Sequence, residues 1–179
     1  MDKDSIQVVK DYIEAWNNND SERMKSLVHP NYSVGKRTRD SYTIIEDEVP
    51  YFEANNTEKN EIDLLLLRMK KYHKGLSEFN MALIDINSLG THVWADMDLT
   101  GIHSGPLFGI SPSNNPLLIR GMFHYQIKDG LLYKADWLYD TVSLLKQFGK
   151  SIKGANITEA AQYLSLLSKM GLIDSSDKI

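Results

Sequence analysis

The sequence predicts an α+β domain in which helices pack on one face of a curved antiparallel sheet. In the first 75 residues, apolar side chains recur every three or four positions, which is the spacing of an amphipathic helix. From residue 79 onward they alternate with polar side chains, as in strands that bury one face. The length of 179 residues fits a single domain of ordinary size. The helices therefore come first and the sheet follows.

The first two helices are recognised by their apolar stripes and their ends. The stripe of the first helix is Ile6, Val9, Ile13 and Trp16. Asp4 or Ser5 is suitable as its N-cap. The inner face of a second, short helix is Met24, Leu27 and Val28. This helix must end before Pro30, because the residue that precedes a proline avoids helical backbone angles.

A third helix is expected between a cap at Thr57 and a stop at Gly75. Its apolar stripe is Ile62, Leu65, Leu66, Met69 and Tyr72. Residues 33–57, which precede it, are less regular and carry basic and acidic side chains around Pro50. We interpret them as a loop, which is either a solvated excursion or a lid over a pocket.

Two pairs of strands follow the third helix. The expected strands are residues 79–86, 91–100, 117–128 and 131–139. The last two flank Asp129-Gly130, a dipeptide that is typical of two-residue hairpins. A helical turn at 141–148 and a last helix at 158–170 complete the expected elements.

Composition and charge narrow the classes of function. The net charge at pH 7 is −4, so a broad nucleic-acid-binding surface is not expected. The absence of cysteine excludes disulfides, thiolate metal sites and a cysteine nucleophile. The histidines show no pair at ligand spacing on a helix, so no metal site is expected. The acidic N-terminus does not resemble a signal peptide, and no apolar run is long enough for a bilayer, which predicts a cytoplasmic protein.

The hairpin around Asp129-Gly130 predicts which side chains share a face. With a two-residue turn, the opposed pairs are Ile127 with Leu132, Phe123 with Asp136, and Ile119 with Asp140. One face is then apolar and ends in the two carboxylates. The other face would carry Arg120, Met122, His124, Gln126, Lys128, Tyr133, Trp137 and Tyr139. A three-residue turn would change these pairings.

Two carboxylates on an apolar face suggest acid/base chemistry. Desolvation favours the protonated carboxyl group, and a second carboxylate nearby raises the pKa of one of the two further. Asp136 and Asp140 are therefore candidates for a general acid or base. Two alternatives remain open: Asp140 as the N-cap of the helical turn that follows, and Asp136 turned outward or paired with a basic side chain.

His103 lies between Gly101 and Gly105, just after the second expected strand. If that strand continues through Gly101, His103 is on the same side as the apolar residues. The flanking glycines allow a bulge or a close approach of the backbone. The side chain is either a catalytic group that faces a pocket or a buried structural residue.

Three stretches together resemble one protein family. LTGIHSGPLFGISPSNNP (residues 99–116) is similar to the Thr-Gly-x-His-x-Gly run of SnoaL-like polyketide cyclases. IRGMFHYQIKDGLLYKADWLYDTVSLLKQFG (119–149) resembles their final hairpin with its Asp and its Leu-Leu-x-Gln-x-Gly helix. VVKDYIEAWNNNDSERMKSLVHPNY (8–32) looks like their opening helices. The resemblance covers most of residues 5–149. The SnoaL-like family belongs to the nuclear transport factor 2-like superfamily.

The resemblance implies a cone-shaped α+β barrel, in which the N-terminal helices close a strongly curved antiparallel sheet around a deep pocket. It implies a family domain at 1–150, with 151–179 as a C-terminal helical extension and polar tail. It also implies a homodimer through the outer sheet face, and intramolecular aldol closure of a polyketide ester without metal or cofactor. The catalytic residues would be Asp140 and His103. The side chains expected to bind the substrate are Asp136, Trp16, Phe123, Tyr125 and Phe108.

Several functions are compatible with such a pocket. The first is polyketide cyclisation, or the related proton transfer of a ketosteroid isomerase, with Asp140 as the base. The second is a binding module for an apolar or aromatic ligand. The third is a scaffold that dimerises through Tyr133, Trp137 and Tyr139. In each case we expect Asp136 and Asp140 to disfavour a strongly anionic ligand.

Overall fold

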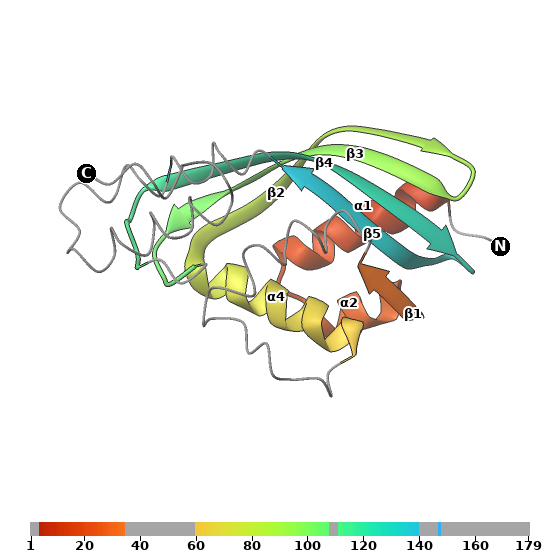
Figure 1. The fold of residues 1–179 in the computed structure, drawn as a ribbon, viewed down its shortest axis with the longest axis horizontal. Coiled ribbons are helices and arrows are strands. Elements are labelled where there is room, and N and C mark those ends of the chain that lie inside the picture. The colour runs from red at the N-terminus through yellow and green to blue at the C-terminus, as the bar shows by residue number, and fades with distance from the viewer. Residues whose placement is uncertain (1–3, 35–59, 108–110, 140–146, 148–179) are drawn as a thin grey trace, which may run out of the picture.

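The computed structural model describes residues 4–34, 60–107, 111–139 and 147. Its elements are α1 (Ser5–Asn17), α2 (Ser21–Leu27), β1 (Val28–Val34), α4 (Glu61–Gly75), β2 (Leu76–Leu89), β3 (His92–His103), β4 (Pro116–Lys128) and β5 (Leu131–Tyr139). The described helices precede the four long strands, and β1 between α2 and α4 is the exception to this order (Figure 1). The expected α+β class is confirmed.

The helices begin where polar side chains can cap their free backbone N–H groups. Asp4 accepts from the backbone N–H of Ile6, which decides between the two expected caps of α1. Asn60 accepts from the backbone N–H of Asp63 at 2.9 Å, so α4 begins at Glu61 and its cap is Asn60 rather than Thr57. The end of α4 at Gly75 agrees with the prediction.

The strands form one mixed sheet in the order β1-β5-β4-β3-β2. The four long strands pair antiparallel, as expected, whereas β1 pairs parallel with β5. The sequence did not predict β1, because Pro30 was interpreted only as the end of a helix. A proline is tolerated here because β1 is an edge strand, where one side of the backbone needs no strand partner.

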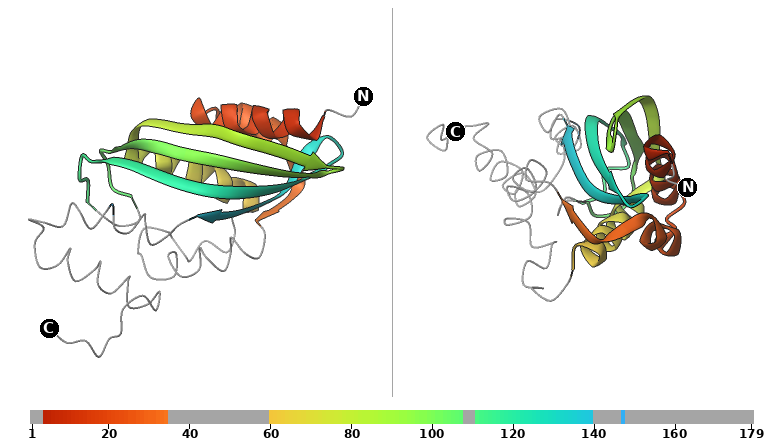
Figure 2. Two further views of the ribbon diagram at one scale, coloured as in Figure 1. Left: turned by 90° about the horizontal axis from the view of Figure 1, so that it is seen from above. Right: turned by 90° about the vertical axis from the view of Figure 1, so that its right-hand side faces the viewer.

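The core lies between the inner face of the sheet and helices α1 and α4 (Figure 2). In β3 every second residue from Val93 to His103 is buried, so the alternation predicted from the sequence is confirmed. α1 packs against β2, β3, β4 and β5, and α4 packs against β1 and β2. The strong curvature that the resemblance implies for the sheet stays a prediction.

The hairpin between β4 and β5 has the expected two-residue turn. Asp129 and Gly130 both have positive φ, of 51° and 71°, and Lys128 pairs with Leu131 across the turn. This is the conformation that an Asp-Gly hairpin favours, since its twist matches that of the strands.

β5 contains one extra residue directly after its first two pairs with β4. Ile127 pairs with Leu132, but the next residue of β4, Gln126, pairs with Lys134. Tyr133 is therefore a β-bulge. The His29 ring of β1 lies edge-on to the Tyr133 ring at 5.3 Å, and the Lys128 ammonium lies over that ring at 5.1 Å. The bulge is thus stabilised by both neighbours of β5.

Gly105 allows the segment after β3 to approach the end of α4. The carbonyl of Gly75 accepts hydrogen bonds from the backbone N–H groups of Ser104 and Gly105, at 3.1 and 3.0 Å. A Cβ atom at Gly105 would overlap the carbonyl oxygen of Lys74. This contact fixes the position of the segment that carries the Gly-x-His-x-Gly motif.

Next to the end of the described part of β5, the side chain of Gln147 takes the place of a strand partner for β4. Its side-chain carbonyl accepts from the backbone N–H of Leu118, and its side-chain amide donates to the carbonyl of Leu118, both at 2.8 Å. Two such bonds reproduce the pattern of a neighbouring strand. They give a physical reason for a glutamine in the Leu-Leu-x-Gln-x-Gly stretch.

Within the described ranges, no helix has the length and apolar character needed to cross a membrane. The excursion at 33–57 falls on described residues only up to Val34, which belongs to β1. The helical turn at 141–148, apart from Gln147, and the C-terminal extension at 151–179 lie outside the described residues.

Candidate functional site

A hollow lies between the inner face of the sheet and helices α1 and α4, and its volume of about 530 Å³ includes space that is open to solvent. The described lining residues are Tyr12, Trp16, Arg68, Tyr72, Met81, Leu99, Ile119, Phe123, Tyr125, Trp137 and Tyr139. Seven of these eleven are aromatic and three are aliphatic. The walls therefore suit a flat, apolar ligand.

Helical spacing brings the α-helical part of the lining together. Tyr12 and Trp16 are one turn apart on α1, and Arg68 and Tyr72 are one turn apart on α4. The Trp16 and Tyr72 rings meet edge to face at 6.0 Å, and the Tyr12 and Tyr125 rings do so at 5.7 Å. Such pairs hold the rings in fixed orientations, so the walls are preorganised.

The bulge at Tyr133 determines which side chains of β5 face the pocket. After it, His124 pairs with Asp136 and Phe123 pairs with Trp137. Trp137 and Tyr139 consequently line the pocket. The prediction that they lie on the outer face is wrong, because it assumed a regular ladder, and one extra residue exchanges the two faces of a strand.

The same shift moves Asp136 away from the pocket. The predicted pairing of Asp136 with Phe123 is wrong, and Asp136 lies on the outer face of the sheet instead. There its Oδ2 is 3.8 Å from Nδ1 of His124, whose Nε2 is 3.0 Å from Nδ1 of His92. Leu138, which was also expected on the apolar face, is largely exposed. Asp136 is not among the described residues that line the pocket.

Three of the side chains expected to bind the substrate do line the pocket: Trp16, Phe123 and Tyr125. The other predicted residues, Phe108 and Asp140, lie outside the described residues. The pairing of Asp140 with Ile119 rested on the regular ladder that the bulge interrupts. What remains in support of Asp140 is therefore the sequence resemblance.

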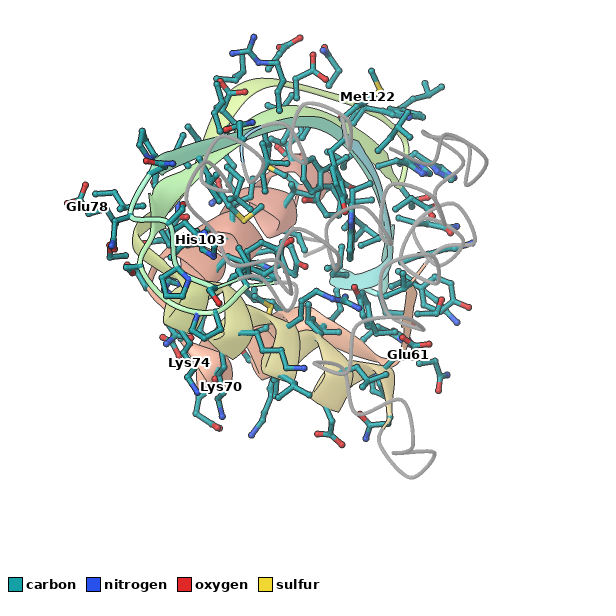
Figure 3. The ribbon with its side chains drawn as sticks, turned by 60° about the vertical axis from the view of Figure 1, so that its left-hand side comes forward. Glu61, Lys70, Lys74, Glu78, His103 and Met122 are labelled. Carbon is teal, nitrogen blue, oxygen red and sulfur yellow. The ribbon has the colours of Figure 1, made fainter. Side chains whose placement is uncertain are left out.

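His103 lies on the buried side of β3, as the alternation of the strand predicts (Figure 3). It is fully buried. Its Nδ1 lies 3.1 Å from Oγ of Ser113 and accepts from the backbone N–H of Ser113 at 3.3 Å. Since a backbone N–H only donates, the neutral imidazole carries its proton on Nε2. His103 thus anchors the segment that leads into β4, and it is not among the described lining residues of the pocket.

The described lining contains one charged side chain. Arg68 on α4 is only 8% exposed, and its guanidinium lies over the Trp137 ring at 5.1 Å from the centroid. A guanidinium keeps its charge at any physiological pH, and a facing indole partly compensates its burial. No carboxylate is found among the lining residues that the structure describes.

Two neutral polar groups also belong to the lining. Trp16 Nε1 and Tyr125 Oη are buried, and neither has a hydrogen-bond partner among the described residues. Burial raises the pKa of the Tyr125 phenol well above its ordinary value, and Tyr12 and Tyr32 raise it further. Tyr125 therefore stays protonated, and both groups can donate a hydrogen bond to a ligand.

Sequence analysis missed Arg68 and Tyr12, and it named Tyr72 only as a residue of the apolar stripe, although a signal for Arg68 was present. It lies three residues after Leu65 and four before Tyr72, inside the apolar stripe of α4. A charged residue at a core position of a helix is uncommon. Trp137 and Tyr139 were named but placed on the wrong face. In the described parts of the chain, no three His, Asp or Glu side chains are grouped to hold a metal ion.

Comparison with known families identifies the chain. The family model of the SnoaL-like polyketide cyclases matches residues 35–148. The chain belongs to this family. The resemblance found in the sequence is thereby confirmed. A search against curated proteins finds no match.

Solved structures agree with the fold of this SnoaL-like protein. TsrD from Streptomyces laurentii matches with a TM-score of 0.65 at 20% identity, over 83% of this chain and 98% of that one. IdmH from Streptomyces antibioticus matches with a TM-score of 0.63 at 16% identity, over 82% and 99%. A hypothetical protein with a ketosteroid isomerase-like fold from Catenulispora acidiphila, in complex with trimethylamine, matches with 0.57 at 10%, over 80% and 92%. At these identities the likeness establishes the nuclear transport factor 2-like fold.

Proposed function

We propose that this SnoaL-like protein performs acid/base chemistry on a small apolar carbonyl compound, without a cofactor. The reaction would be an intramolecular aldol-type cyclisation or a related enolisation. The observation that carries the proposal is the pocket, which joins aromatic walls to two buried donors, Trp16 Nε1 and Tyr125 Oη. Donors of this kind can stabilise the oxygen of a carbonyl as it becomes negative. Family membership supports the reaction class.

In the proposed mechanism, the carboxylate of Asp140 removes a proton from a carbon next to a carbonyl group. The enolate carbon then attacks a second carbonyl carbon, so that a carbon–carbon bond forms and the carbonyl π bond breaks. The resulting alkoxide takes the proton back from Asp140. The family resemblance gives His103 the oxyanion role; its neutral imidazole carries the proton on Nε2, but His103 is not among the described residues that line the pocket, so its role is tested separately below. No net proton, electron or cofactor is consumed.

The experiment that tests this proposal is α-proton exchange on 2-tetralone in deuterium oxide, followed by NMR. We expect Asp140→Asn to reduce the protein-dependent exchange rate by about a hundredfold or more, since the amide cannot accept the proton. Asp63→Asn, which makes the same change at an exposed site on α4, is the control and should exchange like the unaltered protein. Circular dichroism checks that both variants keep the fold.

Unaltered exchange in Asp140→Asn would remove Asp140 from the mechanism. If the unaltered protein does not accelerate exchange at all, acid/base chemistry on this class of ketone is contradicted. His103→Gln separates two roles for the histidine. Loss of exchange with an unchanged unfolding midpoint would support the oxyanion role, and a lowered midpoint with retained exchange would leave only its anchoring role.

A second function, binding without chemistry, is favoured by one observation. The described lining of the pocket contains donors and rings but no carboxylate that could serve as a base. In this case the protein would be a small-molecule-binding module of the same fold. Tight binding of an aromatic ketone, measured by calorimetry together with a complete absence of exchange, would support it.

We propose in addition that two copies of the chain associate through the outer sheet face. Trp94, Leu118, Met122 and Leu138 are large apolar residues exposed on this face. Met122 and Leu138 pair across β4 and β5 and are 54% and 63% exposed, and Met122 points away from the helices (Figure 3). Charged residues lie beside them, since Asp96 pairs with Met122 and Arg120 forms an ion pair with Asp98. A surface that combines exposed apolar residues with polar ones is typical of an interface.

Met122→Glu is expected to convert the dimer into monomers, because it replaces an exposed apolar side chain by a carboxylate directly opposite Asp96. Light scattering coupled to gel filtration measures the mass directly. Leu64→Glu on α4 introduces the same charge on another exposed surface and should leave the mass unchanged. A monomeric unaltered protein, or a dimeric Met122→Glu variant, would contradict this assignment.

A further inference from the structure

Two lining residues of the pocket meet where helices α1 and α4 end. Trp16 lies in the last turn of α1 and Tyr72 in the last turn of α4. Their rings are in edge-to-face contact at 6.0 Å between centroids, so the wall of the pocket is continuous across the two helices. The separation of the helix ends therefore decides how much room a ligand finds beside these two rings.

Each of these two residues is followed by a polar residue that binds the backbone of another lining residue. After Tyr72, the Nε2 atom of His73 is 2.7 Å from the carbonyl oxygen of Trp16. Because a carbonyl oxygen only accepts, this Nε2 carries a proton and donates it. After Trp16, the side chain of Asn17 donates to the carbonyl of Met81 at 3.1 Å and accepts from its backbone N–H at 2.7 Å. Three lining residues are thus linked by their neighbours.

These hydrogen bonds act where the backbone has few other partners. The last four carbonyl groups of a helix lack the N–H partner that the helix itself would supply. A histidine near the end of a helix can bind one of them, and His73 binds that of Trp16. Met81 lies on the edge strand β2, where the side chain of Asn17 takes the place of a further strand. The end of α1 is therefore fixed both to α4 and to the edge of the sheet.

Phe79 fills the space behind this wall and is not among the described lining residues. Its ring lies 4.5 Å from the His73 ring and 6.0 Å from the rings of Trp16 and Tyr72, between centroids. His73 thus has two contacts, a hydrogen bond and packing against Phe79, that substitutions can separate. Leucine keeps the apolar packing and loses the hydrogen bond. Glutamine loses the ring and keeps an N–H donor.

We infer that His73 and Asn17 are positioning residues that keep the wall closed between α1 and α4, and that the closed wall selects flat ligands over thick ones. This inference deepens the proposed function, on which it rests for the use of the pocket. Neither side chain is among the described lining residues, so His73 acts through Trp16, and Asn17 through Met81. A ligand that needs extra room must displace packed groups, which is costly. A loosened wall lowers this cost and with it the preference.

The test compares two ketones that differ in thickness, the flat 2-tetralone and the globular 2-adamantanone, by calorimetry on the full chain at pH 7. Both carry one carbonyl oxygen, so a hydrogen bond to this oxygen enters both affinities. We expect the unaltered protein to bind 2-tetralone about tenfold more tightly or better. His73→Leu should narrow this preference to about threefold or less, without weaker binding of 2-adamantanone. His73→Gln should restore the preference to within about twofold, because its amide can donate to the carbonyl of Trp16.

Lys74→Leu is the matched control. It introduces the same side chain at the next residue of α4, which is exposed and outside the described lining, and it should leave the preference unchanged (Figure 3). Asn17→Ala provides a second variant in case His73→Leu does not fold. It removes both hydrogen bonds to Met81 and should narrow the preference in the same way. Circular dichroism checks the fold of each variant.

A purely structural role for His73 and Asn17 would weaken the binding of both ketones in the same proportion. An unchanged preference in a folded variant would therefore overturn the inference. So would a His73→Gln variant that behaves like His73→Leu, equal affinity of the unaltered protein for the two ketones, or no binding of either.

Failure of the proposed function is read separately, from 2-tetralone exchange. Exchange together with a preference that His73→Leu does not narrow overturns only the positioning role. A narrowed preference in a protein that does not accelerate exchange supports the positioning role and contradicts the acid/base reaction.

Discussion

Insertion of an alanine between Ala135 and Asp136 is expected to destabilise the protein by about 4 kcal/mol or more, or to prevent cooperative folding. The inserted residue would take the place of Asp136 opposite His124, and Asp136 would move opposite Phe123. Asp136 would then enter the apolar pocket, and Trp137 would leave it. Burial of an unpaired carboxylate and loss of a buried indole are both costly. Urea unfolding followed by tryptophan fluorescence and circular dichroism measures the loss.

The control is Tyr133→Ala, which keeps the number of residues and therefore the bulge. It loses the ring contacts with His29 and Lys128, so a loss of about 1 kcal/mol is expected. If the insertion were no more destabilising than the alanine variant, the number of residues in β5 would not be what fixes its two faces.

The second large effect is expected at Gly105. Replacement by alanine should destabilise the fold by about 3 kcal/mol or more, because the new Cβ would overlap the carbonyl oxygen of Lys74. The two backbone hydrogen bonds to the carbonyl of Gly75 would be lengthened as the segment moves away. Urea unfolding monitored by circular dichroism gives the difference in free energy of unfolding.

Gly90→Ala separates steric overlap from backbone strain. Gly90 has a φ of 61°, but a Cβ at this position would meet no atom within 4 Å. Its replacement should therefore cost about 1 kcal/mol, from the left-handed backbone alone. An equal loss in the free energy of unfolding for Gly90→Ala and Gly105→Ala would show that the contact between Gly105 and the end of α4 is not tight.

Local patterns predicted most of the architecture correctly. The stripes of α1 and α4, the alternation of β3 and the turn at Asp129-Gly130 each depend on neighbours within a few residues. The buried side of β3, with His103 on it, followed from the same alternation. Such features are visible in a sequence because helical and strand periods are fixed by backbone geometry.

The errors arose where distant segments decide the outcome. The bulge at Tyr133 is supported by His29, which lies on a strand at the other end of the described chain. No local pattern indicated it, and a shift of one residue was enough to place Asp136, Trp137 and Tyr139 on the wrong faces. The pocket is therefore more aromatic, and its described lining less acidic, than the hairpin predicted.

The parallel pairing of β1 with β5 has a consequence for the order in which the chain can fold. Val28 pairs with Leu132, so roughly a hundred residues separate the two partners. During synthesis from the N-terminus, β1 emerges long before β5 and must wait for it with an unpaired backbone edge. Contacts of such long range also make folding slow. The first strand to leave the ribosome is thus among the last to find its place.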